Sequence, residues 1–213
     1  MIEIKKFVFN PFQENTYLIW DTNSKCTAVV DPGCSSPYEE QQIADFIKTN
    51  LLSIKFLINT HCHIDHILGN KFIKENYKCE FWAPDKDVFM LKLMEEHAKN
   101  FGMNLKESPQ PDKLISEEIE LNLDGTIGKF LFTPGHTPGE YCIYFPLESV
   151  CITGDVLFKE GIGRTDLWGG DYNLLINSIK TKLFTLPEDV KIYPGHGEPS
   201  TIGYEKLHNP FLI

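Results

Sequence analysis

Four residues of types that bind metal ions lie within six positions of one another, in the segment 61–66 with the sequence HCHIDH. In an extended chain, side chains two positions apart point to the same side, so His61 and His63 can bind the same ion. Asp65 and His66 lie where the chain is predicted to enter a helix, and they therefore face a second point nearby. This spacing indicates two adjacent metal ions rather than one. Imidazole and carboxylate ligands are typical of zinc, iron or manganese sites, whereas a solvated polar loop, the alternative, does not need such a concentration of histidine.

Three further residues of ligand type stand where predicted strands end, each on a loop that glycine constrains: His136 in PGHTPG, Asp155 in ITGD and His196 in PGHG. Each of the three is a weak signal by itself. Because loops at one edge of a sheet can converge on one site, we expect these residues to join those of segment 61–66. The seven side chains together would give each of two ions three terminal ligands, with one carboxylate bridging them.

The remaining thiol and imidazole side chains are expected to have no part in this site. Cys62 stands between two predicted ligands of an extended segment, so its side chain points away from theirs and we expect a packed thiol. His97 lies in a predicted helix among charged residues and His208 lies near the C-terminus, and we expect neither to be a ligand. The six cysteines show no CxxC spacing, which favours reduced thiols in a cytoplasmic protein.

Apolar residues recur with the period of a strand in some segments and with that of a helix in others, which is typical of an α/β chain. Strands are predicted at residues 2–9, 16–20, 27–30, 54–58, 80–83, 119–123, 129–133, 141–145, 150–153 and 190–193. Helices are predicted at residues 37–51, with Ser36 as the N-cap, and at 67–77, 85–101, 172–184 and 201–208. Two helices are expected to bury apolar side chains on one face, namely Ile43, Phe46, Ile47 and Leu51 in the first and Leu175, Ile176, Ile179 and Leu183 in the fourth.

The composition is that of a globular chain, with 213 residues of which 42% are apolar and 23% charged, and a formal net charge of 20 − 30 = −10. An acidic chain is a poor candidate for nucleic-acid binding, which needs a basic surface. No apolar run approaches the length of a membrane span, and the first residues lack the pattern of a signal peptide. The segment 108–112 (SPQPD) is interpreted as an exposed loop within one domain of residues 1–213.

The order HCHIDH, GHTPG, GD and PGHG resembles that of the metallo-β-lactamase superfamily, and NTY at 15–17 and VDPG at 30–33 extend the resemblance over nearly the whole chain. It implies an α/β fold, a four-layer αβ/βα sandwich with the metals at one edge of the sheets. It also implies one ion held by His61, His63 and His136 and a second held by Asp65, His66 and His196, with Asp155 bridging them. Asp31 matches a buried aspartate that family members use as a structural support beside the site.

Within the superfamily, GIGRTDL at 161–167 after GDVLF at 154–158 is similar to the glyoxalase II group, the hydroxyacylglutathione hydrolases. This resemblance implies a small anionic thioester as substrate, S-lactoylglutathione or a related compound. Arg164 stands where longer relatives place a lysine that holds glutathione, and it is the candidate substrate-binding residue, with an ion pair to Asp166 or Asp171 as the alternative. Asp166 stands close to the position of a substrate-contacting tyrosine in those relatives. The chain ends soon after PGHG, so we expect no C-terminal glutathione-binding helical domain, as in short bacterial members.

The resemblance implies hydrolysis by a hydroxide that bridges two divalent metal ions, with zinc expected and iron or manganese as alternatives. Asp65 and Asp155 are the expected catalytic carboxylates, in their role as ligands. The rival activities within the superfamily are a persulfide dioxygenase with a single iron and a lactonase, and the PGHG sequence favours the hydrolase over the dioxygenase. A non-catalytic binding module would have no need of seven metal ligands.

Overall fold

The computed structural model describes residues 1–100, 102 and 107–213, and the chain divides into two compact units. Unit 1 comprises Met1–Leu114 and Leu123–Thr126, and unit 2 comprises Ile115–Asn122 and Ile127–Ile213. The expectation of one domain over residues 1–213 stays a prediction. No helix of the described residues combines the length and the apolar character that a membrane span requires.

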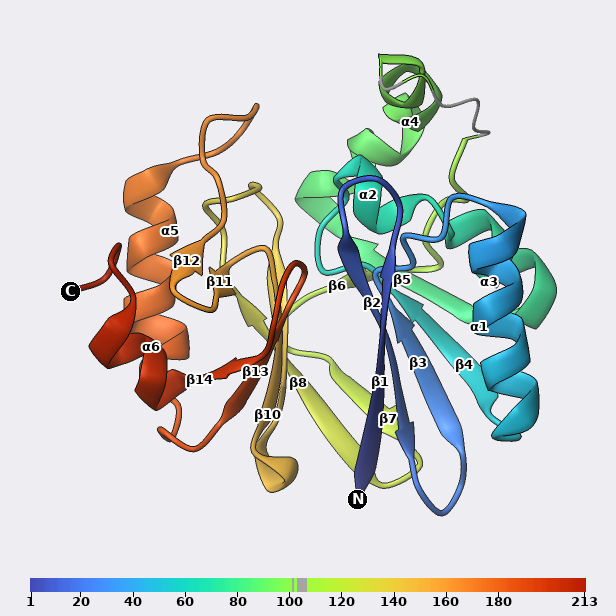
Figure 1. Ribbon diagram of the computed structural model, residues 1–213, viewed down its shortest axis with the longest axis horizontal. Coiled ribbons are helices and arrows are strands. Elements are labelled where there is room, and N and C mark those ends of the chain that lie inside the picture. The colour runs from blue at the N-terminus through green and yellow to red at the C-terminus, as the bar shows by residue number, and fades with distance from the viewer. Residues whose placement is uncertain (101, 103–106) are drawn as a thin grey trace. The chain divides into compact units, whose positions relative to one another are not determined.

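Unit 1 is built on a six-stranded sheet in the order β1-β2-β3-β4-β5-β6 (Figure 1). The first three strands are antiparallel neighbours, whereas β3, β4 and β5 run parallel. The five predicted strands are confirmed to within two residues at each end, and β6 was not predicted. The strands are β1 (Ile2–Phe9), β2 (Glu14–Asp21), β3 (Cys26–Val30), β4 (Ser53–Ile58), β5 (Glu80–Pro84) and β6 (Lys113–Ile115).

Helices α1 (Pro37–Thr49), α3 (Asn70–Tyr77) and α4 (Val88–Asn100) contribute to one hydrophobic cluster with this sheet. Ile43 and Ile47 of α1 are buried in it as predicted, and Phe46 packs against it. The prediction for Leu51 is wrong, because the helix ends at Thr49 and the side chain of Leu51 is 81% exposed. Residues 85–101 begin as a 3₁₀ turn, η1 (Asp85–Asp87), before α4, and Phe101 lies outside the described residues.

The predicted helix at 67–77 is in fact two helices, α2 (Ile64–Ile67) and α3. Gly69 separates them, and its N–H donates a hydrogen bond to the Pro32 carbonyl oxygen at 2.7 Å. A Cβ at residue 69 would overlap Sγ of Cys34. The helix therefore breaks at the only residue type that lets its backbone approach the 32–34 segment so closely.

The segment 108–112 forms no helix or strand, but it is less exposed than predicted. The hydroxyl of Ser108 is buried and accepts a hydrogen bond from Asn70 Nδ2 at 3.0 Å. The carboxylate of Asp112 accepts hydrogen bonds from the Lys74 ammonium and from the Phe81 N–H. These contacts attach the segment to α3 and β5.

Unit 2 is built on a second six-stranded sheet, in the order β14-β13-β10-β9-β8-β7. The central pair β10 and β13 is parallel, and β8, β9 and β10 are antiparallel neighbours. The predicted strands are confirmed to within three residues, whereas β14 and a separate hairpin of β11 and β12 were not predicted. The strands are β7 (Glu120–Leu123), β8 (Thr126–Phe132), β9 (Tyr141–Phe145), β10 (Val150–Gly154), β11 (Leu157–Phe158), β12 (Gly161–Ile162), β13 (Lys191–Pro194) and β14 (Ser200–Thr201).

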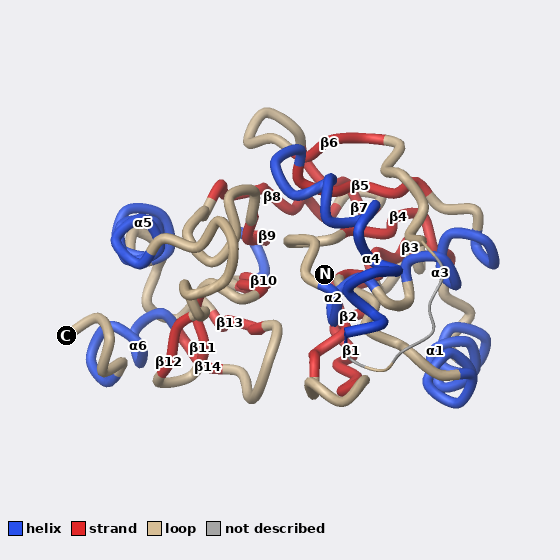
Figure 2. Tube along the Cα trace, turned by 90° about the horizontal axis from the view of Figure 1, so that it is seen from above, coloured by secondary structure: helices blue, strands red, loops and turns tan. Residues whose placement is uncertain are grey.

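Helices α5 (Tyr172–Ser178) and α6 (Ile202–His208) lie on the same side of this second sheet (Figures 1 and 2). The predicted helix at 172–184 is confirmed, with its last part a π-helical turn, η3 (Ile179–Leu183). Its side chains Leu175, Ile179 and Leu183 are buried as predicted, and Ile176 packs against the same cluster. All six cysteines of the chain are free and buried.

The start of α1 is fixed by the carboxylate of Glu39. Ser36 is the N-cap as predicted, and it forms a capping box with Glu39. The Glu39 carboxylate also accepts hydrogen bonds from the N–H groups of Ser35 at 2.7 Å and Asn10 at 2.8 Å. Burial alone would raise the pKa of Glu39, but these hydrogen bonds lower it below its ordinary value of 4.5.

We therefore predict that the Glu39 carboxylate contributes to the free energy of unfolding in a pH-dependent way, and that Glu39→Gln removes this contribution. A carboxyl group whose pKa is lowered by folding stabilises the folded state above its unfolded pKa, and this contribution is lost as the pH falls through the folded pKa. From pH 4.5 downward, the free energy of unfolding measured by urea titration should fall less steeply in Glu39→Gln than in the wild type. Glu40→Gln, next in the same helix, is the control, because burial raises the pKa of Glu40 and its removal should not flatten the profile. Equal acid slopes for Glu39→Gln and the wild type would contradict the prediction.

Candidate metal centre

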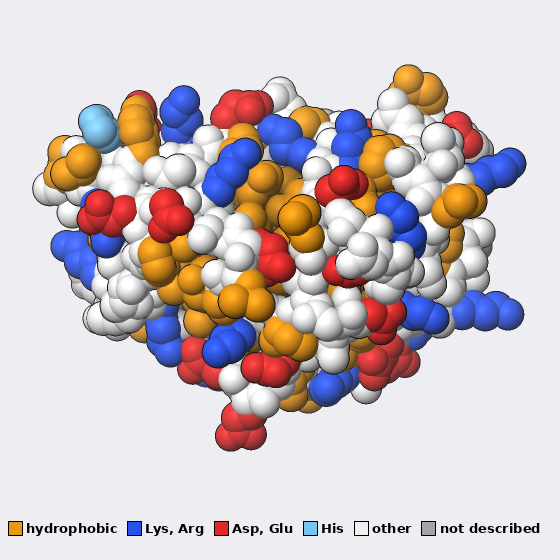
Figure 3. Space-filling view, turned by 90° about the horizontal axis from the view of Figure 1, so that it is seen from below, with side chains coloured by type: hydrophobic (Ala, Val, Ile, Leu, Met, Phe, Trp, Pro, Cys, Tyr) orange, Lys and Arg blue, Asp and Glu red, His pale blue; other side chains and the backbone are white. Residues whose placement is uncertain are grey.

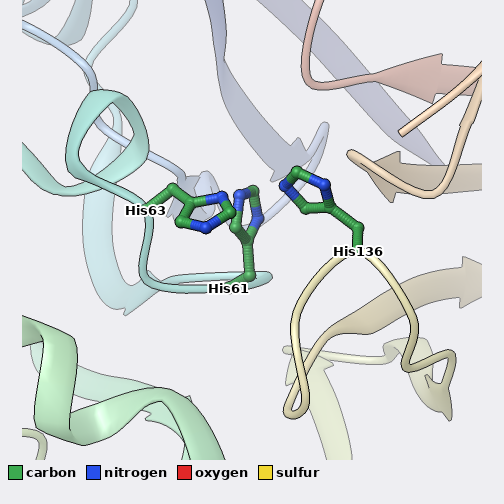
Figure 4. A group of neighbouring side chains, drawn as sticks. All are labelled: His61, His63 and His136. Carbon is green, nitrogen blue, oxygen red and sulfur yellow. The ribbon is translucent and has the colours of Figure 1, made fainter. Parts of the chain in front are cut away.

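The first group of predicted ligands lies in unit 1, on the short loop between the end of β4 at Ile58 and the start of α2 at Ile64. His61 is fully buried and His63 is half-buried, and both belong to this loop (Figure 4). Their rings are perpendicular, with centroids 4.9 Å apart. The alternation that the sequence predicted is thus realised, with both imidazoles close enough to bind one ion.

Asp65 and His66 follow in the first turn of α2. The His66 ring is fully buried, and its centroid lies 4.1 Å from that of His61. Nε2 of His66 lies 3.7 Å from Oδ2 of Asp65. All four predicted ligands of segment 61–66 are therefore brought together within unit 1.

Asp31 contacts both His66 and Thr60, the residue that precedes His61. Its carboxylate accepts hydrogen bonds from the Thr60 N–H at 2.7 Å and from the Thr60 hydroxyl at 2.6 Å. It also lies 3.2 Å from Nδ1 of His66. A carboxylate close to Nδ1 is a common neighbour of a histidine that binds a metal ion through Nε2.

The hydrogen bonds of Thr60 assign the tautomer of His61. The Thr60 hydroxyl has one hydrogen, which it donates to Asp31. Its contact with Nδ1 of His61, at 3.1 Å, must then be a hydrogen bond that His61 donates. The lone pair of His61 is therefore on Nε2.

The second group of predicted ligands lies in unit 2, on three loops that follow β8, β10 and β13. His136 stands between β8 and β9 (Figure 4), Asp155 directly after β10 and His196 shortly after β13. Nδ1 of His136 donates to the Arg164 carbonyl oxygen at 2.7 Å, since a carbonyl can only accept, so its lone pair is on Nε2. Oδ2 of Asp155 lies 3.6 Å from Nε2 of His136 and 3.6 Å from Nε2 of His196.

These separations fit metal ligands. Two ligand atoms that each lie about 2.1 Å from one ion are about 3.4 Å apart at the tetrahedral angle. The distances of 3.6 Å in unit 2 and 3.7 Å in unit 1 are close to that value and longer than a hydrogen bond. Asp155 stands equally near to two histidines, which is the position that a bridging carboxylate needs. The donor set of imidazole nitrogens and carboxylate oxygens suits zinc, iron or manganese.

Two residues that were predicted to lie outside the site have contacts of other kinds. Cys62 is buried in the hydrophobic cluster of unit 1, and burial raises the pKa of its thiol. His208 stacks on Tyr204, and its Nδ1 contacts the carbonyl oxygen of that residue at 3.0 Å. The side chain of His97 lies outside the described residues.

Arg164 forms the ion pair that the sequence left open as an alternative. Its Nε and one terminal nitrogen donate to the two carboxylate oxygens of Asp166 at 2.8 and 2.7 Å. The Arg164 side chain is 59% exposed, and Asp166 raises the pKa of its guanidinium. Asp171, the other possible partner, instead caps α5 by accepting from the Leu174 N–H. Arg164 thus has an exposed guanidinium paired with Asp166, while its own main-chain carbonyl orients His136.

Two buried carboxyl groups beside the ligands were not singled out from the sequence. Glu14 in β2 is fully buried, and its Oε2 lies 2.9 Å from the Thr16 hydroxyl. Burial raises the pKa of Glu14 well above the ordinary value. Glu140 is fully buried after the His136 loop, and its Oε1 accepts from the Asp155 N–H at 2.7 Å. The only available signal was a glutamate at the edge of a predicted buried strand, where an acidic residue needs a specific partner.

The sequence model of the metallo-beta-lactamase superfamily matches residues 9–196, and the chain belongs to this superfamily. It is 42% identical over 203 residues to the hydroxyacylglutathione hydrolase GloC of Haemophilus influenzae, with 94% of this chain and 93% of that protein covered. It is 33% identical to the probable metallo-hydrolase YqgX of Bacillus subtilis, over 98% of this chain and 96% of that one. The resemblance to the superfamily and to its hydroxyacylglutathione hydrolases is thus confirmed.

Solved structures confirm the predicted fold. The crystal structure of the BLEG-1 B3 metallo-β-lactamase is similar with a TM-score of 0.89, at 31% identity and with 99% of both chains covered. The crystal structure of TTHA1623 in a di-iron-bound form is similar with a TM-score of 0.86, at 29% identity, covering 98% of this chain and all of that one. The chain has the metallo-β-lactamase fold and is a metallo-hydrolase of a superfamily that binds divalent metals, often two.

We predict that Asp31→Ala destabilises the metal-free protein by about 2–5 kcal/mol, because two buried donors of Thr60 lose their acceptor. Thr60→Val is the matched control. It removes the hydroxyl but keeps the N–H bond to Asp31, so a loss of about 1–2 kcal/mol is expected. Urea unfolding of both metal-free variants measures these differences. A metal-free Asp31→Ala protein as stable as the wild type would show that Asp31 does not support the loop.

Proposed function

We propose that this chain hydrolyses thioesters in the manner of glyoxalase II, with S-lactoylglutathione or a related anionic thioester as substrate. The observation that carries the proposal is the ligand set. Hydrogen bonds place the lone pairs of His61 and His136 on Nε2, and carboxylates lie at ligand-to-ligand distances from His66, His136 and His196. The similarity to a protein named as a hydroxyacylglutathione hydrolase supports the choice of substrate class.

The ligand assignment follows the family resemblance. One divalent ion would be held by His61, His63 and His136, a second by Asp65, His66 and His196, with Asp155 between them. Zinc is the proposed metal, and iron and manganese suit the same donors. When bound, such ions supply a water of lowered pKa for attack on a carbonyl and positive charge that stabilises the oxyanion.

The residues of the chain have roles that do not depend on the identity of the metal. Thr60 holds the tautomer of His61, and the Arg164 carbonyl holds that of His136. Asp31 accepts hydrogen bonds from both donors of Thr60 and lies 3.2 Å from Nδ1 of His66. A thiolate leaving group needs little protonic assistance, because the pKa of a thiol is about 8.5. A thioester therefore suits a site whose acidic residues serve as ligands or supports.

The charge of the molecule agrees with a small anionic substrate rather than a polyanion. Two divalent ions would change the net charge from −10 to −10 + 4 = −6 and concentrate positive charge at the site. Figure 3 shows acidic and basic side chains interspersed over the face that it presents. We also propose a reducing compartment, the cytoplasm, because all six cysteines are free.

The direct test is thiol release from S-lactoylglutathione by protein loaded separately with zinc, iron and manganese. Hydrolysis with a two-metal form is the expected result. Hydrolysis of a β-lactam is measured in parallel, because one structure of 31% identity is named as a β-lactamase. Oxygen consumption with a persulfide and a single iron would overturn the proposal in favour of the dioxygenase.

We predict that Asp65→Ala lowers thioester hydrolysis by at least about 100-fold while the protein stays folded. Asp65 is partly exposed in the first turn of α2, so its removal takes away a ligand rather than core packing. Its loss should weaken the second ion first. Asp45→Ala, an exposed carboxylate on α1, is the control. A wild-type rate in Asp65→Ala with two metals bound would remove Asp65 from the ligand set.

We predict that Arg164→Ala raises KM for the anionic thioester by about tenfold and lowers kcat much less. A guanidinium that binds a remote carboxylate acts equally in the ground and transition states, so its removal leaves the chemistry unchanged. Asp166→Asn is the matched control, because it breaks the same ion pair but keeps the cation. If both variants lower the melting temperature equally and leave KM unchanged, the pair is structural and Arg164 does not bind substrate.

A further inference from the structure

Glu140 is a fully buried glutamate at the point where the His136 loop ends and β9 begins. Its main-chain carbonyl accepts a hydrogen bond from the Thr133 N–H at 2.9 Å, which closes the loop that presents His136. Its side chain reaches a different loop, where Oε1 accepts from the Asp155 N–H at 2.7 Å. One residue thus connects the loops of two predicted ligands.

The Asp155 N–H needs such an acceptor. Gly154, the preceding residue, has a φ of 49°, so the chain leaves the geometry of β10 there. Asp155 is buried, and a buried N–H without an acceptor costs about 1–3 kcal/mol. Oε1 of Glu140 supplies this acceptor at 2.7 Å.

The other side of the Asp155 main chain is held by packing. A Cβ at residue 163 would overlap the carbonyl oxygen of Asp155, so Gly163 lies directly against it. Arg164, the next residue, accepts from Nδ1 of His136. The main chain of Asp155 is therefore fixed at its N–H by the hydrogen bond to Glu140 and at its carbonyl by the packing of Gly163. From this fixed position its Oδ2 lies equally far from His136 and His196.

We propose that Glu140 is a positioning residue for Asp155. Its hydrogen bond to the Asp155 N–H holds the Asp155 carboxylate between His136 and His196, and this position determines the affinity of the site for its divalent metal. This inference rests on the proposed function in one respect, the role of Asp155 as a bridging ligand. The property that matters for this role is that the Glu140 side chain is long enough to bring an acceptor oxygen to the Asp155 N–H. Groups that orient metal ligands typically change metal affinity by about 10- to 100-fold when they are removed.

The test uses the full chain with metal removed by a chelator, and measures zinc affinity by competition with a chromophoric chelator. Glu140→Gln keeps an acceptor oxygen at the same reach and should bind zinc within about threefold of the wild type. Glu140→Asp is one methylene shorter and Glu140→Met has no such acceptor, and both should lose about 10- to 100-fold in affinity. The melting temperature of each metal-free variant is recorded in parallel.

Glu205 provides the matched control. It is also fully buried in unit 2, and its carboxylate accepts hydrogen bonds from the Glu160 N–H at 2.8 Å, the Ser200 hydroxyl and Asn209 Nδ2, none of which belongs to a predicted ligand. Glu205→Met should lower the melting temperature as Glu140→Met does, yet keep zinc affinity within about twofold of the wild type. This comparison separates a positioning role from a general loss of stability.

Two results would overturn the inference. One is equal zinc affinity in Glu140→Asp, Glu140→Gln and the wild type. The other is a loss of affinity in Glu205→Met as large as that in Glu140→Met. If Glu140→Met does not fold, the comparison of Glu140→Asp with Glu140→Gln decides alone. A wild-type protein that binds no metal would refute the proposed function itself, and wild-type metal binding without thioester hydrolysis would refute only the substrate.

Discussion

Hydrogen bonds that fix Nδ1 of the buried histidines are the interaction on which the rest of this site depends. Nδ1 of His61 donates to a hydroxyl and Nδ1 of His136 to a carbonyl, and Nδ1 of His66 lies against a carboxylate. The first two of these contacts leave the lone pair on Nε2, and carboxylates, which are also acceptors, lie close to His66 and His136. Groups of acceptors are stable in a protein interior only when a cation or protons join them. The grouped acceptors in each of the two units therefore require a cation or protons beside them.

The strands of the two sheets fix the start of each loop that carries these side chains. The ligands follow β4 in unit 1 and β8, β10 and β13 in unit 2, so buried strands fix their positions on short loops. Glycines allow the close approaches that these loops need, as at Gly163 against the Asp155 carbonyl. Carboxylates behind the loops, Asp31 in unit 1 and Glu140 in unit 2, hold the backbone N–H groups that precede or belong to ligands.

The sequence predicts the long strands and all seven candidate ligands, because apolar periodicity and local spacing carry that information. It does not predict β6 or the β11–β12 hairpin, which are two or three residues long and exist through pairing with distant or neighbouring segments. The break at Gly69 depends on contact with Pro32, which local helix propensity cannot reveal. The role of Glu140 also depends on a partner, Asp155, fifteen positions away in the chain. Local signals therefore indicate the candidate ligands, whereas the residues that contact and orient them become visible only in three dimensions.

The central claim, that seven side chains hold two metal ions, is tested most directly by anomalous X-ray diffraction from crystals of the purified protein at the absorption edge of its metal. The account predicts two peaks, one beside His61, His63 and His136 and one beside Asp65, His66 and His196, with Asp155 within ligand distance of both. A single peak, or peaks away from these side chains in a fully active protein, would contradict it.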